Sequence, residues 1–162
     1  MPEAQRIAEL VRSTYEGDAK GEAWHGPALK PLLQGVTAAQ AAQRPAAGKH
    51  SIWELVLHIA NWEGVSVRRL AGQRVEFDFD TPGDWPRITE TSEAAWHAAL
   101  QRLEQNNKKL RETIAACSAA QLEEKAVNRD FTHYVALHGI VHHGIYHAGQ
   151  IAILKRALRP VV

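Results

Sequence analysis

Apolar residues recur at intervals of three and four along four long stretches of the chain, which is the spacing of amphipathic helices. The stretches cover roughly residues 2–16, 51–70, 92–116 and 132–158, and the third could begin as early as residue 89. Strand-like alternation is confined to residues 75–80, which lead directly into Pro82 and Gly83. The pattern therefore predicts an all-α protein.

Residues that cap or stop helices stand at the ends of these stretches. Ser51 and Glu54 have the spacing of a capping box. Gly17 follows the first stretch and Pro160 follows the last one, and both residue types are typical of a helix end. We therefore expect the four helices to begin and end close to these positions.

Three long segments join the four predicted helices. Residues 17–48 are rich in Gly and Pro, with room for a short helix over residues 37–43 that Thr37 could cap. Residues 72–88 contain several aromatic side chains, and residues 118–129 form a further linker. Connections of this length predict a four-helix bundle with long crossover connections rather than a simple up-and-down bundle.

Composition narrows the class of protein and its partners. The chain has 162 residues, of which 45% are hydrophobic and 23% charged, and this balance predicts a single globular domain over residues 1–162. A formal net charge of +1 gives no reason to expect nucleic acid or an anionic membrane as a partner. Neither a membrane-spanning stretch nor a secretory signal is recognisable, so a cytoplasmic location is expected. The single cysteine, Cys117, excludes a thiolate metal cluster and leaves histidine or carboxylate as ligands for any metal.

Histidines are concentrated near the end of the chain. Five of the nine fall within 15 residues, where an even distribution would place about one: His133, His138, His142, His143 and His147. On a helical wheel, His143 lies within roughly 40° of His147, in the apolar stripe of the helix. His138 and His142 lie roughly 140° to 180° away, on the side expected to face solvent or an interface. The pair His143 and His147 is therefore the stronger candidate for a buried site.

A third histidine points inward from a different helix. On the wheel of residues 51–70, His58 is flanked by Leu55, Trp62 and Val65. Each buried imidazole has a donor and an acceptor that need partners, and one divalent ion bound to His58, His143 and His147 would be a shared partner for the acceptor nitrogens of all three rings. Three protein ligands also leave a position for water or substrate, as in catalytic metal sites. The alternative, in which the rings are hydrogen-bonded residues of the core, stays open.

Several other polar residues have two interpretations. Glu54 and Asn61 lie one turn on either side of His58 and could orient it or supply a fourth ligand, or they could be a capping Glu and a surface Asn. Tyr146 and Gln150 are near the pair in sequence, but the pattern does not place them at the site. Cys117 is expected to be a small buried residue. The remaining histidines are expected to be solvated or to act as local caps: His25, His50, His97 and His133.

Residues 138–151, which contain His-x-x-x-His followed by a small residue and Gly-Gln-Ile, together with residues 52–60, resemble the DinB/YfiT-like superfamily. This resemblance implies a four-helix bundle with a long crossover, commonly dimeric, that holds zinc or nickel through three histidines. Carried over residue by residue, these ligands match His58, His143 and His147. Some members transfer low-molecular-weight thiols such as bacillithiol or mycothiol to electrophiles, and others isomerise or hydrolyse small molecules.

Three hypotheses for the function follow. In the first, the protein is an enzyme of the thiol S-transferase or hydrolase type, in which the ion activates a thiol or water for attack on a small electrophile. In the second, the ion is held for structure or sequestration, and the helical dimer serves a stress response or binds a partner. In the third, the chain is a metal-free homodimer, whose interface uses the second apolar face of residues 51–70: Ile52, Val56, Ala60 and Val67.

Overall fold

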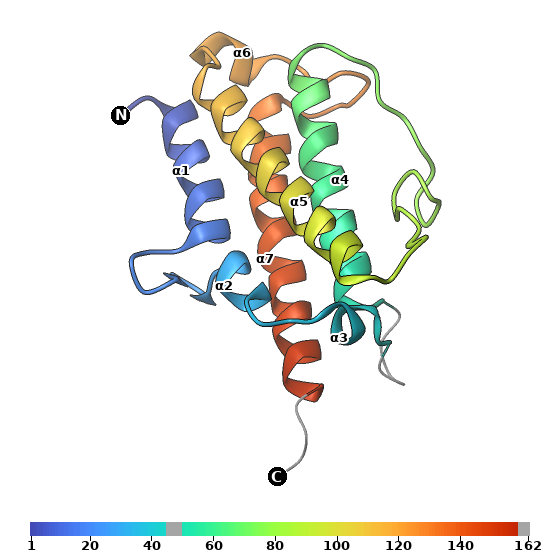
Figure 1. Cartoon of the computed structure of the whole chain (residues 1–162). Coiled ribbons are helices and arrows are strands. Elements are labelled where there is room, and N and C mark those ends of the chain that lie inside the picture. Colours follow the sequence, from blue (N-terminus) through green and yellow to red (C-terminus); the bar gives the residue numbers. More distant parts are fainter. Residues whose placement is uncertain (45–49, 159–162) are drawn as a thin grey trace.

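Helices dominate the computed structural model, which describes residues 1–44 and 50–158 (Figure 1). The long helices are α1 (Glu3–Glu16), α4 (Ile52–Leu70), α5 (Glu93–Ala115) and α7 (His133–Ala157). The short ones are α2 (Leu29–Leu33), α3 (Ala38–Ala42) and α6 (Ala119–Glu123), and strand β1 (Glu22–Ala23) pairs antiparallel with β2 (Gly26–Pro27). The predicted all-α class is confirmed.

The helices begin at the residues that cap them. The side chain of Ser51 accepts a hydrogen bond from the backbone N–H of Glu54, and the Glu54 carboxylate accepts one from Ser51 in return. Thr37 forms the same kind of box at the start of α3, as its position predicted, and Thr132 caps α7. The helix end expected at Pro160 lies outside the described residues. Residues 45–48 of the first connection also lie outside them.

The connection between α4 and α5 crosses back along the length of the molecule. In Figure 1, α1 and α7 run in one direction while α4 and α5 run in the other, so the chain must return between α4 and α5. Residues 75–80 of this connection, where the sequence shows strand-like alternation, do not form a strand. The linker expected over residues 118–129 contains the short helix α6, which begins at Ser118 as its cap.

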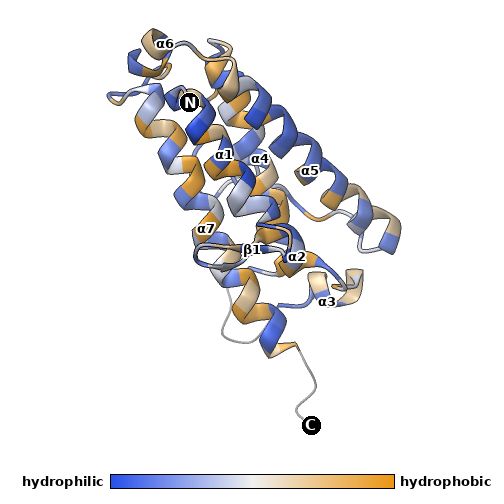
Figure 2. Ribbon diagram, turned by 90° about the vertical axis from the view of Figure 1, so that its left-hand side faces the viewer, coloured by the Kyte–Doolittle hydropathy of each residue, from blue (hydrophilic) through white to orange (hydrophobic). Residues whose placement is uncertain are grey.

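The core lies between the four long helices. Each of them contacts two others: α4 packs against α5 and α7, and α1 also packs against α5 and α7. The face of α4 that the sequence offered as a dimer interface is instead part of this core, because Ile52, Val56 and Ala60 are fully buried. Figure 2 shows hydrophilic residues along the visible face of α5, which agrees with the solvated face expected of a peripheral helix. Among the described residues, no helix combines the length and apolar content needed to cross a membrane.

Candidate metal centre

Three histidines meet at the contact between α4 and α7. His58 comes from α4, whereas His143 and His147 lie one turn apart on α7. One nitrogen of each ring lies within 4.8 Å of the corresponding nitrogen of the other two. His58 and His147 are buried and His143 is partly buried. The structure thus brings together the three side chains that the helical pattern directed toward one point.

The orientation of His58 is fixed by the connection between α4 and α5. Its Nδ1 lies 2.9 Å from the backbone carbonyl oxygen of Asp84, so Nδ1 carries the proton and donates it. In that tautomer Nε2 is the acceptor, and it lies 2.9 Å from Nε2 of His143. His58 therefore presents a lone pair to the other two rings.

Asp84 also ties this connection to α4 through its side chain. Its carboxylate accepts a hydrogen bond from Nε1 of Trp62 at 2.9 Å and one from the backbone N–H of Asp80 at 3.1 Å. Asn61 adds a second tie, because its amide donates to the carbonyl oxygen of Gly83 at 2.7 Å. Asn61 thus acts on the site through the backbone next to Asp84. The sequence pattern gave no indication of Asp84, since the contact depends on how a 22-residue connection folds back.

Aromatic rings cover the outer side of His58. Trp85 stacks on His58 with ring centroids 3.8 Å apart, and His50 stacks on the opposite face of Trp85 at 3.6 Å. His50 was expected to be a solvated or capping residue, so its place in this stack is a correction. The stack limits the approach of water to His58 from this side, which supports the low polarity of the site.

His147 is oriented from within its own helix. Its Nδ1 lies 2.6 Å from Oε1 of Gln150, one turn further along α7, so Nδ1 donates and Nε2 is left as an acceptor. The spacing of three residues between them is the signal that could have placed Gln150 at the site from sequence. His143 differs from the other two, because its buried Nδ1 has no hydrogen-bond partner among the described residues.

All three imidazoles are held in the neutral form. Burial, reinforced by the neighbouring rings of His147 and His58, lowers the pKa of His143 to about 3. Burial lowers the pKa of His147 to about 4, against the opposing effect of the hydrogen bond that His147 donates to Gln150. Burial is also the main cause of the lowered pKa of His58. A neutral imidazole has the lone pair that a metal ligand needs. At neutral pH the cluster is therefore ready to bind a cation.

The donor set fits a divalent transition-metal ion. Two of the rings have their Nδ1 protons committed to Asp84 and Gln150, which directs their Nε2 lone pairs toward the centre. This arrangement, in which an outer hydrogen bond fixes the tautomer of each ligand, is the usual environment of metal-bound histidine. If the cluster were held by hydrogen bonds alone, Nε2 of His143 would carry the proton and donate it to Nε2 of His58. The buried Nδ1 of His143 would then be an acceptor with no donor among the described residues. The three histidines could thus hold a metal ion.

A cavity of about 350 Å³ lies next to the cluster. His143 and Trp62 are among the residues that line it, and most of the others are apolar. His133, expected to be solvated or a local cap, is instead buried in this wall in the first turn of α7. The volume is within the range of small-molecule sites, so a ligand in this cavity would lie directly beside one ring of the cluster.

Four of the remaining candidates do not contribute a ligand atom to the cluster. His142 is exposed, and Nδ1 of His138 lies 3.0 Å from the carbonyl oxygen of Tyr134, so this pair does not join the site. Glu54 is occupied by its cap hydrogen bonds and by an ion pair with Arg44, which agrees with the capping interpretation. The ring of exposed Tyr146 packs edge-on against that of His147, with centroids 5.0 Å apart.

The fold and the site together define a class: helical proteins in which three histidines from two long helices can hold a metal ion beside a small cavity. The family model of the DinB superfamily matches residues 23–151, a segment that contains all three histidines. The chain therefore belongs to the DinB superfamily. No curated protein and no solved structure matches it.

Proposed function

We propose that the protein is a metal-dependent enzyme that promotes attack of a thiol or of water on a small electrophile, as a thiol S-transferase or a hydrolase. The observation that carries this proposal is the position of His143, which belongs to the three-histidine cluster and also lines the cavity. A cluster that only stabilised the fold would not need a face on a cavity of substrate size. This favours catalysis over storage of the metal.

The chain's own residues bind and position the ion. His58, His143 and His147 are the proposed ligands, with zinc or nickel as the expected ion because imidazole suits both. When bound, such an ion supplies Lewis acidity, which lowers the pKa of a water or thiol so that a nucleophile is available at neutral pH. Asp84 and Gln150 hold two of the rings in the tautomer that binds metal. The stacked ring of Trp85 limits the access of bulk water to His58.

The nucleophile is proposed to come from outside the chain. Cys117 is the only thiol in the sequence, and its Sγ donates a hydrogen bond to the carbonyl oxygen of Thr113 at 3.4 Å. Burial raises the pKa of the Cys117 thiol, which disfavours the reactive thiolate. Cys117 also lies outside the cavity beside His143. A substrate thiol of low molecular weight, or water, fills this role in the proposal.

We also propose that the protein forms a homodimer through α7. Two large apolar side chains on this helix, Tyr146 and Ile153, are 65% and 71% exposed, and a dimer formed through α7 would bury them. Light scattering coupled to gel filtration measures the mass directly. A monomeric mass of about 18 kDa at micromolar concentration would refute the dimer without affecting the proposed metal site.

Elemental analysis of protein purified without a histidine tag tests the metal site. We expect about one zinc or nickel ion per chain in the wild type and none in the His143→Ala/His147→Ala double variant. The matched control is His138→Ala/His142→Ala, which removes two histidines at the same spacing from the same helix and should retain the metal. Wild-type protein that binds no divalent ion after reconstitution, or equal loss in the control, would refute the site.

Turnover is tested on the metal-loaded protein. A panel of small thiols is paired with electrophiles such as chlorodinitrobenzene, and activated esters report hydrolysis. We expect activity that disappears on chelation and in His58→Ala. Full activity in His58→Ala with full metal content would contradict the proposed mechanism.

A further inference from the structure

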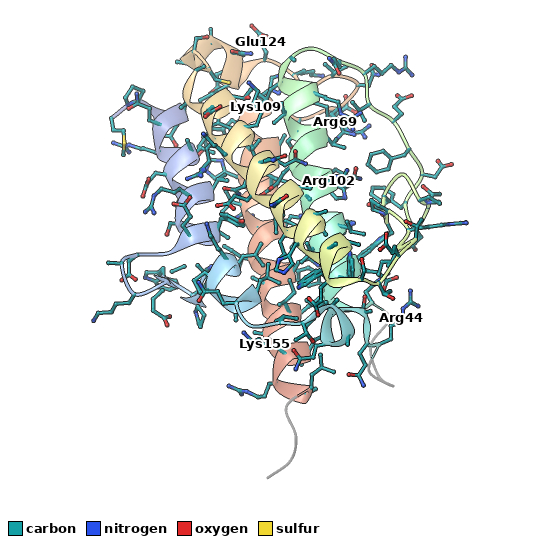
Figure 3. The ribbon with its side chains drawn as sticks, viewed as in Figure 1. Arg44, Arg69, Arg102, Lys109, Glu124 and Lys155 are labelled. Carbon is teal, nitrogen blue, oxygen red and sulfur yellow. The ribbon has the colours of Figure 1, made fainter. Side chains whose placement is uncertain are left out.

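Two arginines line the cavity beside the histidine cluster. Arg69 lies near the end of α4 next to the crossing connection (Figure 3), and Arg129 lies in the segment that precedes α7. One nitrogen of Arg69 donates to the carbonyl oxygen of Val75 at 2.9 Å, and its guanidinium carbon lies 5.6 Å from the ring centre of Trp62. The side-chain bond of Arg129 is to the carbonyl oxygen of the adjacent Asn128 at 3.1 Å. Within the described residues, neither guanidinium forms an ion pair.

Arg69 also has an unused donor inside the protein. Its Nε is buried and has no hydrogen-bond partner among the described residues. Buried polar groups almost always have a partner, and a charged donor without one is costly. The guanidinium of Arg69 therefore has hydrogen-bonding capacity that the described residues leave unused.

The charged side chains of the cavity wall are positive. Burial, together with the charges of Arg129 and Arg68, lowers the pKa of Arg69, while Glu76 opposes this shift. The carboxylate of Glu76 is itself held by Arg74 at 2.9 Å and by Asn128 at 3.3 Å. Arg68, Arg74 and Glu76 are all exposed, so among the described residues that line the cavity the permanently charged side chains are Arg69 and Arg129. This positive wall suits a ligand with a negatively charged group.

We propose that this cavity binds a small apolar molecule that carries one carboxylate group, with the carboxylate bound by Arg69 and Arg129 and the apolar body lying toward His143. The proposal rests on the proposed function, because it names the substrate class of the same site. The planar guanidinium fork matches the two oxygens of a carboxylate. The apolar side chains of the wall, among them Leu70, Phe131 and Ile140, provide the surface for the rest of the molecule.

Isothermal titration calorimetry on the full chain, with and without zinc, tests this inference. The probe is 4-phenylbutyrate, and its neutral amide, 4-phenylbutyramide, is the control ligand. We expect the carboxylate to bind about tenfold more tightly than the amide, because charge-assisted hydrogen bonds are roughly twice as strong as neutral ones. The preference should decrease at high salt.

Arginine variants locate the binding. Arg69→Gln and Arg129→Gln should each weaken 4-phenylbutyrate binding about tenfold and weaken amide binding less, so that the preference for the carboxylate decreases. Arg68→Gln is the matched control, because this arginine is adjacent in sequence but exposed, and it should bind as the wild type does. Circular dichroism verifies that each variant is folded. If the loss of the Val75 contact unfolds Arg69→Gln, the Arg129→Gln variant still decides the outcome.

The outcomes separate this inference from the proposed function. Equal affinity for the two probes, no binding of either at millimolar concentration, or wild-type binding in both arginine variants would overturn the carboxylate site, whatever the metal content. Arginine-dependent preference in a protein that binds no metal would support the carboxylate site and refute the metal enzyme. The His143→Ala/His147→Ala variant should lose the metal and keep the arginine-dependent preference.

Discussion

Replacing Glu63 by Gln should stabilise the protein in a pH-dependent way. Glu63 lies in α4 and is only 5% exposed. Its Oε1 accepts a hydrogen bond from the Asn107 amide at 2.7 Å, whereas Glu63 Oε2 and Asn107 Oδ1 have no hydrogen-bond partner among the described residues. Burial raises the pKa of Glu63 from 4.5 to about 8, against the opposing effects of Asn107 and Arg111. The folded protein therefore holds Glu63 protonated at neutral pH, with an O–H donor that could meet the acceptor need of Asn107.

The magnitude follows from the difference between the two pKa values. Below pH 4.5 the carboxyl group is protonated in both the folded and the unfolded chain, so its burial does not make the free energy of unfolding depend on pH. Between pH 4.5 and about 8 only the folded chain binds the proton, and each pH unit lowers the free energy of unfolding by about 1.4 kcal/mol. At pH 7 the accumulated cost is about 3 kcal/mol. Glu63→Gln keeps the shape and the hydrogen-bonding capacity of the protonated acid and removes this cost.

Urea unfolding of metal-free wild type and Glu63→Gln, followed by far-UV circular dichroism at pH 4.5, 6 and 7.5, measures the effect. Differences between the two proteins cancel the titration of all other groups. The variant should be nearly as stable as the wild type at pH 4.5 and more stable by about 3 kcal/mol near pH 7. A difference that stays constant with pH, or that grows as the pH falls, would refute a protonated Glu63.

Three further predictions concern the metal site and the helix that carries it. Zinc at 100 times its Kd should raise the free energy of unfolding of the wild type by about 2.7 kcal/mol in urea titrations. It should not change the free energy of unfolding of the His143→Ala/His147→Ala variant. Asp84→Ala should weaken zinc binding by about 10- to 100-fold in competition titrations, because the backbone that orients His58 loses its ties; unchanged affinity would show that the side chain of Asp84 is dispensable. Ser51→Ala should lower the free energy of unfolding by about 1 kcal/mol in urea at unchanged zinc affinity, and a loss below 0.3 kcal/mol would contradict the capping argument.

The sequence was sufficient where the relevant physics is local. Helix starts depend on residues within one turn, so the predicted caps Ser51 and Thr37 are confirmed, and the last helix begins next to residue 132, as expected. The inward direction of the three histidines could also be predicted, because a helical wheel needs only the chain's own periodicity. These local signals were strong enough to select His58 and to set aside His138 and His142.

The parts that the sequence did not reveal depend on contacts between distant segments. Asp84 and Trp85 reach His58 only because the connection between α4 and α5 folds back on α4. Nothing in the local pattern around Arg129 indicates that it lies beside Arg69, since the packing of α4 and α7 brings them together. The burial of His133 has the same origin, because its first-turn position alone is compatible with either solvent or core.

The distance in sequence between the proposed ligands bears on the order of events during folding. His58 and His143 are separated by 85 residues, and they belong to different helices. A chain in which α4 and α7 have not yet docked offers at most the local pair on α7, which is too few ligands for tight binding. Zinc should therefore enter after this docking and leave the rate of the earlier steps unchanged, unlike small metal modules whose ligands are neighbours in sequence and fold around the ion. The supply of metal would therefore change the rate of unfolding and not the rate of folding.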